Sequence, residues 1–161
     1  MKNKKAIIIL TIIILIVGGV IWFGYNFAPG SYPYAETYEL NYSEEQVKTA
    51  INKFKQEHSE YIVPKVTINN QGSWDLPDGP SEEPPHWYYV VYFYYKNENK
   101  IIFTSTHPSG KNKTTLAFVS INDGLNLGSW KDINKDFSRS ENKEEKKKFE
   151  ERILNKIKEK L

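Results

Sequence analysis

The spacing of hydrophobic residues predicts an amphipathic helix near each end of a domain. From residue 43 to 63, side chains that can form one face recur at three- and four-residue steps: Val47, Ala50, Ile51, Phe54, His58 and Tyr61. Ser43 and Gln46 fit a capping box at the start, and Pro64 ends the pattern. A second capped helix is predicted from Ser138 or Ser140 onward, with these residues on one side: Phe149, Ile153, Leu154, Ile157 and Leu161.

Segments with the pattern of β-strands lie between the two helices. They are 61–69, 87–96, 100–107 and 114–122. The connectors 97–99 and 108–111 are short and polar, which indicates antiparallel hairpins. The order therefore predicts an α+β domain, a four-stranded antiparallel meander flanked by the two helices. Residues 69–86 are expected to form a loop held by Trp74 and Leu76, and 123–137 to be irregular.

The stretch WYYVVYFYYK, residues 87–96, carries seven aromatic side chains in ten positions. Successive side chains of a strand point to opposite faces, so one face cannot hold them all. With 97–99 as a three-residue loop, Phe93 lies opposite Phe103 and Tyr92 opposite Thr104. We therefore predict that the helices cover the face of Trp87, Phe93 and Phe103. The other face is predicted to be open and to contain Tyr88, Tyr92, Tyr94, Thr104 and Thr106.

This open Tyr/Thr face has two interpretations. Tyr and Thr favour strands, and aromatic pairs across strands stabilise a sheet whether or not anything binds. Alternatively, tyrosines combine an apolar ring with a polar tip and are enriched at interfaces. On that reading the five residues of the face, together with Trp74, bind a protein, a peptide edge or the rings of a carbohydrate.

The N-terminal segment predicts a membrane anchor. Lysines dominate residues 1–5, and residues 6–23 contain Thr11 as their only polar side chain. Those eighteen residues span about 27 Å as a helix, close to the ~30 Å hydrocarbon core of a bilayer. We expect a transmembrane anchor over 6–27, a linker over 28–40 and a domain over 41–161.

A cleaved signal peptide is the alternative, but the small residues that cleavage requires are poorly placed around Phe27 and Pro29. Basic residues precede the apolar segment, and none follows it until Lys48. The positive-inside rule therefore predicts a single-pass protein of the bacterial cytoplasmic membrane, with residues 1–5 inside and the domain outside.

Composition narrows the possible chemistry. The chain has 22 Lys and Arg against 20 Asp and Glu, a net charge of +2, which does not favour a nucleic-acid partner. Cysteine is absent, which excludes thiolate catalysis and cysteine metal sites. No nucleotide-binding glycine pattern or calcium-loop spacing is present, so no cofactor and no metal is predicted. His86 and His107, with acids of the 69–86 loop, are the only catalytic candidates.

These observations lead to a main prediction and two alternatives. The main prediction is a non-enzymatic, single-pass envelope protein that binds a macromolecular partner through the aromatic sheet face, in an accessory or immunity-type role. The first alternative is a small envelope hydrolase that uses His86 or His107. The second is a purely structural domain whose sheet face is covered by Trp130 and its neighbours in the chain.

Overall fold

The computed structural model describes residues 2–27, 32–81 and 88–161. The chain divides into two compact units, Met1–Pro33 and Tyr34–Leu161. The first unit contains one helix, α1 (Lys2–Phe27). Its large apolar side chains from Ile7 to Trp22 are exposed.

The prediction of a membrane anchor over 6–27 is contradicted. In the part of the chain that the structure describes, no helix is both long enough and apolar enough to cross a membrane. The predicted location, as a single-pass protein of the bacterial cytoplasmic membrane, is wrong for the same reason.

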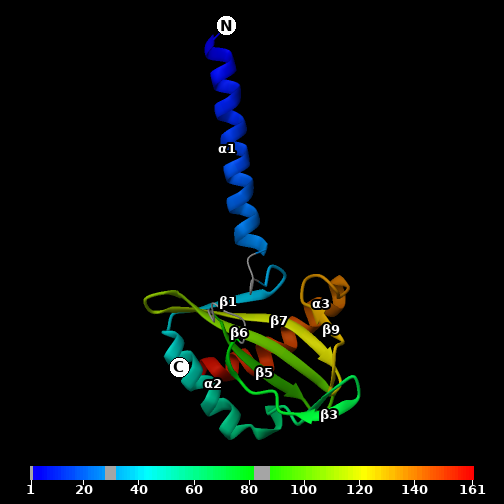
Figure 1. The fold of residues 1–161 in the computed structure, drawn as a ribbon. Helices are drawn as coiled ribbons and strands as arrows, with labels where there is room; N and C mark the ends of the chain where they lie inside the picture. The colour runs from blue at the N-terminus through cyan, green and yellow to red at the C-terminus, as the bar shows by residue number, and fades with distance from the viewer. Residues whose placement is uncertain (1, 28–31, 82–87) are drawn as a thin grey trace. The chain divides into compact units, whose positions relative to one another are not determined.

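The second unit is built around a six-stranded antiparallel sheet (Figure 1). Its strand order is β1-β7-β6-β5-β4, and β9 pairs with β7. The strands are β1 (Glu36–Leu40), β4 (Gly79–Pro80), β5 (Tyr89–Tyr95), β6 (Lys100–Gly110), β7 (Lys113–Asp123) and β9 (Trp130–Asp132). A separate three-stranded sheet has the order β3-β2-β8, with β2 (Val66–Ile68), β3 (Gln71–Trp74) and β8 (Asn126–Leu127).

The predicted four-stranded meander is therefore wrong in strand number and in topology. Its last three strands correspond to β5, β6 and β7, which pair as successive antiparallel neighbours. The strand expected over 61–69 became β2 of the small sheet instead. Strand β1 formed within 28–40, and both β3 and β4 formed within 69–86. These strands are short or polar, and their own sequence does not indicate the partner strands that stabilise them.

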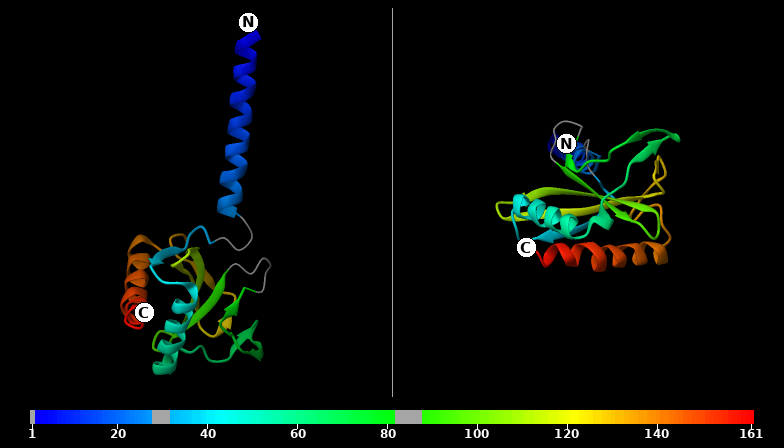
Figure 2. Two further views of the ribbon diagram at one scale, coloured as in Figure 1. Left: turned by 90° about the vertical axis from the view of Figure 1, so that its left-hand side faces the viewer. Right: turned by 90° about the horizontal axis from the view of Figure 1, so that it is seen from below.

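Within the Tyr34–Leu161 unit, α2 and the C-terminal helix pack on one face of the six-stranded sheet (Figure 2). Helix α2 (Glu44–Glu57) begins with the predicted capping box of Ser43 and Gln46. The C-terminal helix consists of α3 (Arg139–Phe149), a π-helical segment η2 (Glu150–Leu154) and α4 (Asn155–Lys158). Its N-cap is Ser138, in a capping box with Glu141. A short 3₁₀ helix, η1 (Ser59–Tyr61), follows α2.

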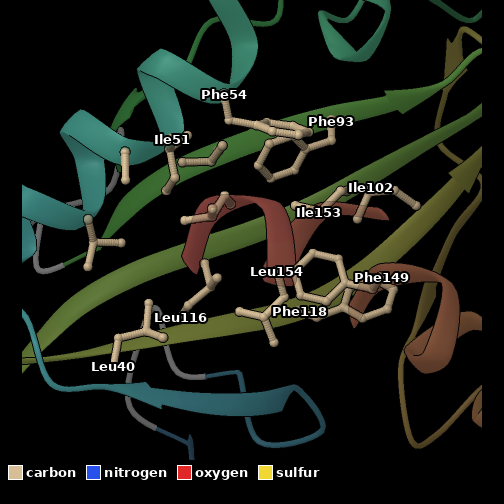
Figure 3. Close-up of a cluster of buried hydrophobic side chains, with 14 of the residues drawn as sticks. Leu40, Ile51, Phe54, Phe93, Ile102, Leu116, Phe118, Phe149, Ile153 and Leu154 are labelled. Atoms are coloured by element: carbon tan, nitrogen blue, oxygen red, sulfur yellow. The ribbon is translucent and has the colours of Figure 1, made fainter. Parts of the chain in front are cut away.

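Between these helices and the sheet lies the main hydrophobic core (Figure 3). Residues from α2, the central strands and the C-terminal helix meet there, including Ile51, Phe54, Phe93, Ile102, Leu116, Phe118, Phe149, Ile153 and Leu154. The Phe118 and Phe149 rings stack with their centroids 4.7 Å apart. The face of Phe93 is therefore the helix-covered face, as its sequence position predicted.

The predicted register between β5 and β6 is wrong by one residue. The turn has four residues, 96–99, and Asn99 adopts a positive φ of 49°. Phe93 consequently pairs with Ile102, and Tyr92 pairs with Phe103. A shift of one residue moves every side chain of β6 to the opposite face. Phe103 thus leaves the helix-covered face, and Thr104 and Thr106 join it.

Candidate functional site

Thr104 and Thr106, predicted for an open face, are fully buried beneath the helices. The Thr104 hydroxyl donates a 2.8 Å hydrogen bond to the backbone carbonyl oxygen of Val91. The Thr106 hydroxyl donates to a carboxylate oxygen of Glu44 in α2, at 3.1 Å. Both hydroxyls thus satisfy polar atoms inside or beside the core, and neither is available to a partner.

Tyr92 and Tyr94 point to the second face of the sheet, where short strands cover them. Tyr94 is 9% exposed and packs in a cluster with Val66 of β2 and with Ile101. The Tyr92 ring stacks on Phe103 at 5.2 Å and lies 6.3 Å from the indole of Trp130. The predicted open face is consequently half-buried at this end.

Trp74 is the predicted site residue that the structure places in solvent, with 56% of its surface exposed. It ends β3, which forms a hairpin with β2 through a turn in which Asn69 and Asn70 both have positive φ. Gly72 has φ +71°, a backbone conformation that favours glycine, and a Cβ there would lie 2.5 Å from the Trp74 Nε1. Ile68 of the same hairpin is 47% exposed. We call Ile68, Trp74 and their two strands the β2–β3 hairpin surface.

Tyr88 is half-buried, and its ring lies edge-on to the ring of His107 at 5.2 Å. His107 pairs with Thr115 of β7, and Thr115 pairs on its other side with Glu39 of β1. Glu39 accepts hydrogen bonds from the hydroxyls of Thr115 and Ser109, at 2.5 and 2.8 Å. These two bonds lower the pKa of Glu39. The Ser109 hydroxyl is therefore bonded to the acid and not to the imidazole, whereas a catalytic triad requires a bond between nucleophile and base.

The described acids of the 69–86 segment are engaged in structural contacts. Asp78 accepts a 2.5 Å hydrogen bond from the Lys55 ammonium and a 2.9 Å bond from the backbone amide of Tyr92. Lys55 also donates to the Tyr92 carbonyl oxygen. Burial lowers the pKa of Lys55, and the Asp78 carboxylate opposes that effect. Asp75 pairs with Lys65 in solvent.

The described residues provide no further part of a hydrolase site. His86 lies outside those residues, as does Trp87 of the aromatic run. Within residues 2–27, 32–81 and 88–161, no group of three or more His, Asp or Glu side chains is arranged to hold a metal ion.

A pocket of about 290 Å³ lies at the end of β5. It is lined by Glu60, Tyr61, Tyr94, Tyr95, Lys96, Asn97 and Arg152, and we call it the tyrosine pocket. Of these residues, Tyr94 was predicted from the sequence as a binding residue. Lys96 and Asn97 are polar and directly follow the aromatic run, so the sequence indicates that the strand ends there. Arg152 comes from the C-terminal helix, and no local signal places it there.

Comparison of the chain with protein-family models, with curated proteins and with solved structures finds no match. The candidate surfaces therefore have to be judged on the contacts, burial and charges of this chain.

Proposed function

We propose that the Tyr34–Leu161 unit is a non-enzymatic binding module that holds a protein partner at the β2–β3 hairpin surface. The observation that carries this proposal is the 56% exposure of Trp74. Burying a large aromatic side chain is strongly favourable, and tryptophan is the side chain most enriched among residues that dominate binding energy.

The position of β3 indicates how such a partner would bind. In the described residues, β3 pairs only with β2 and is an edge strand of the small sheet. An edge strand presents backbone N–H and C=O groups that an extended segment of another protein can pair with. Trp74 and Ile68 supply apolar anchors beside that edge, and the exposed Lys65–Asp75 pair supplies a polar rim.

A purely structural domain is the rival function, and one observation favours it. Trp130 lies 5.9 Å from Phe103 and 6.3 Å from Tyr92, so the chain itself covers part of the aromatic face. This covering accounts for many of the aromatic residues of β5 without any partner. It does not account for the exposure of Trp74.

Site-specific crosslinking tests the proposal. A photocrosslinking amino acid is placed at position 74 in the full chain, expressed in its own host, and adducts are identified by mass spectrometry. Position 42 is the matched control, because Tyr42 is also an exposed aromatic residue (36%) but precedes α2. We expect a discrete protein adduct from position 74 and none from position 42. Equal labelling from both positions contradicts the proposal.

Affinity measurements with the captured protein complete the test. Trp74→Ala is expected to raise the Kd at least about 30-fold, which corresponds to the ≥2 kcal/mol of a dominant contact residue. Tyr42→Ala should leave the Kd within about 2-fold of the unaltered chain. Both variants should unfold at the same denaturant concentration as that chain, because neither side chain is buried. An unchanged Kd for Trp74→Ala would favour the structural rival.

A further inference from the structure

We infer that the tyrosine pocket binds a neutral sugar ring, as a site separate from the β2–β3 hairpin surface. The inference does not rest on the proposed protein partner, since Trp74 and Ile68 are not among the residues that line the pocket. It rests on the combination of aromatic walls, a mixed polar rim and a buried hydroxyl group.

The walls of the pocket are aromatic and fixed in place. The Tyr61 ring meets the Tyr95 ring edge-on, with 6.2 Å between centroids. The guanidinium of Arg152 lies 5.1 Å from the centroid of the Tyr95 ring. Tyr61 is half-buried, so part of its ring remains accessible at the pocket. A sugar ring presents a flat face of C–H groups, and the apolar face of an ordered tyrosine is its natural support.

The rim carries hydrogen-bonding groups of both kinds. The exposed side chains of Lys96 and Asn97 bond to no other side chain or backbone group in the described part of the chain. Lys96 can only donate, whereas the Asn97 amide both donates and accepts. Glu60 offers carboxylate oxygens, one of which lies 3.3 Å from Nδ1 of His58. A sugar hydroxyl also donates and accepts, so it can use every one of these groups.

The charges around the pocket favour a neutral ligand over an ion. Arg152 is already paired with Glu98, with 2.5 Å between nitrogen and oxygen. That leaves Lys96 and Glu60, which have opposite signs. For a ligand of either sign, the attraction to one of these charges is opposed by repulsion from the other, so the pocket has no net charge preference for an ion. A neutral polyol experiences neither repulsion.

The lining residue Tyr95 contributes a buried polar group beside the pocket. Tyr95 is 4% exposed, and its oxygen has no hydrogen-bond partner among the described residues. An unpaired buried hydroxyl is costly, and in folded proteins it commonly marks a position that water or a ligand satisfies. The pocket volume, about 290 Å³, is at the lower end of the range for small-molecule sites. One ring therefore fits better than a longer chain.

Ligand-observed NMR tests the inference. The full chain is titrated with glucose, galactose and N-acetylglucosamine, and saturation-transfer difference signals are recorded. Benzoate and benzylammonium serve as an aromatic anion and an aromatic cation. We expect saturable binding of at least one of the neutral sugars and weaker or no binding of both ions. The β-linked disaccharide of the sugar that binds is then compared with the monosaccharide, and similar affinity is expected if the pocket holds a single ring.

Variants locate the binding. Asn97→Ala and Lys96→Ala should each weaken sugar binding about 5-fold or more without changing stability, because both side chains are exposed. Tyr61→Ala should abolish binding, but it also removes a contact with Phe54 of the core. For this reason the two exposed variants decide the outcome. Tyr34→Ala is the matched control, since Tyr34 is an exposed tyrosine packed on Lys135 and is not a pocket residue.

Three results would overturn the inference. They are no saturable signal from any of the neutral sugars, tighter binding of benzoate or benzylammonium, and sugar binding that survives both Asn97→Ala and Lys96→Ala. Trp74→Ala should leave the sugar titration unchanged. Failure of the sugar site and failure of the protein-binding proposal are therefore distinguishable.

Discussion

The two faces of the six-stranded sheet are covered by different kinds of element. On one face, α2 and the C-terminal helix bury large side chains completely, among them Phe54, Phe93 and Phe149. On the other face, strands of two to four residues cover a smaller cluster, whose buried residues are Val66, Tyr94 and Ile101. Tyr92, Phe103 and Trp130 remain half-buried there. The first face has the features of a stabilising core, and the second, with the exposed Trp74 at its small sheet, has the features of a surface available for contacts.

The largest expected difference between the two faces is in the stability of variants at two neighbouring residues of β5. Phe93→Ala is expected to lower the free energy of unfolding by about 3–5 kcal/mol, because it leaves a cavity among fully buried side chains. Tyr92→Ala is expected to cost about 1–2 kcal/mol, because that ring is already partly in solvent. Urea unfolding of the full chain, followed by near-ultraviolet circular dichroism, measures both.

Should Phe93→Ala fail to fold, Phe93→Leu provides the measurement, with an expected loss of about 1–2 kcal/mol. Tyr92→Phe is then the matched conservative change and should cost less than Phe93→Leu. Equal losses at positions 92 and 93 would show that the two faces contribute equally to the free energy of unfolding, which would contradict the difference described above.

A second test concerns Asp78, which contacts α2 through the Lys55 ammonium and β5 through the Tyr92 amide. Asp78→Ala leaves the ammonium of Lys55 without its carboxylate, although the side chain of that lysine is only 13% exposed. It also removes the acceptor for the Tyr92 amide. We expect a loss of about 2–3 kcal/mol in the free energy of unfolding.

Asp75→Ala is the matched control for Asp78→Ala. Asp75 pairs with Lys65, but the two side chains are 78% and 62% exposed, so water screens the pair. The expected loss is below about 0.5 kcal/mol. Similar losses for the two aspartates would mean that the contacts of Asp78 with Lys55 and Tyr92 do not stabilise the fold.

The sequence predicted helix α2 well because its signals are local and periodic. The spacing of Val47, Ala50, Ile51 and Phe54 specifies one side of α2, and all four are buried in the structure. The capping pair of Ser43 and Gln46 fixes where that helix begins. Such features depend on residues three or four positions apart, which a single sequence displays directly.

The second face was predicted poorly because it depends on choices made by distant residues. A turn of four residues in place of three exchanged the positions of Phe103 and Thr104, since strand side chains alternate. Strands β3 and β8 carry no strong pattern and exist through their pairing with β2. The tyrosine pocket likewise needs Arg152, which reaches it from the C-terminal helix. Trp74 could be singled out as a candidate because a lone tryptophan in a polar segment is visible without knowledge of the fold.

The aromatic contacts of the second face permit a smaller and sharper test. Phe103 and Trp130 lie 5.9 Å apart, with their rings nearly perpendicular. A double-mutant cycle with Phe103→Ala and Trp130→Ala is expected to give a coupling energy of about 0.5–1.5 kcal/mol. Thermal or urea unfolding of the four chains provides the values. A coupling near zero would mean that the contact between Phe103 and Trp130 adds no stability to this face.

The smallest expected effect concerns Glu98, in the turn between β5 and β6, which joins the turn to the C-terminal helix. Burial alone would raise the pKa of Glu98, but hydrogen bonds from Arg152 and Lys148 outweigh it and hold the pKa below its usual value. A carboxyl whose pKa is lowered by folding adds stability above its unfolded pKa of about 4.3, and this stability is lost as the pH falls through the folded value. Glu98→Gln should therefore cost roughly 1 kcal/mol at pH 6. The difference from the unaltered chain should shrink steadily toward pH 3.

Glu39 provides the contrast for that measurement, because its pKa is lowered chiefly by the hydroxyls of Thr115 and Ser109 rather than by cations. Glu39→Gln should show the same direction of pH dependence, since its folded pKa is also lowered. Added sodium chloride at pH 6 should reduce the effect of Glu98→Gln, whose partners are charged, and leave that of Glu39→Gln nearly unchanged. If salt reduced both equally, the Glu39 carboxylate would have to be stabilised by a nearby cation. His107 is the first candidate for that cation, because its charge also lowers the pKa of Glu39.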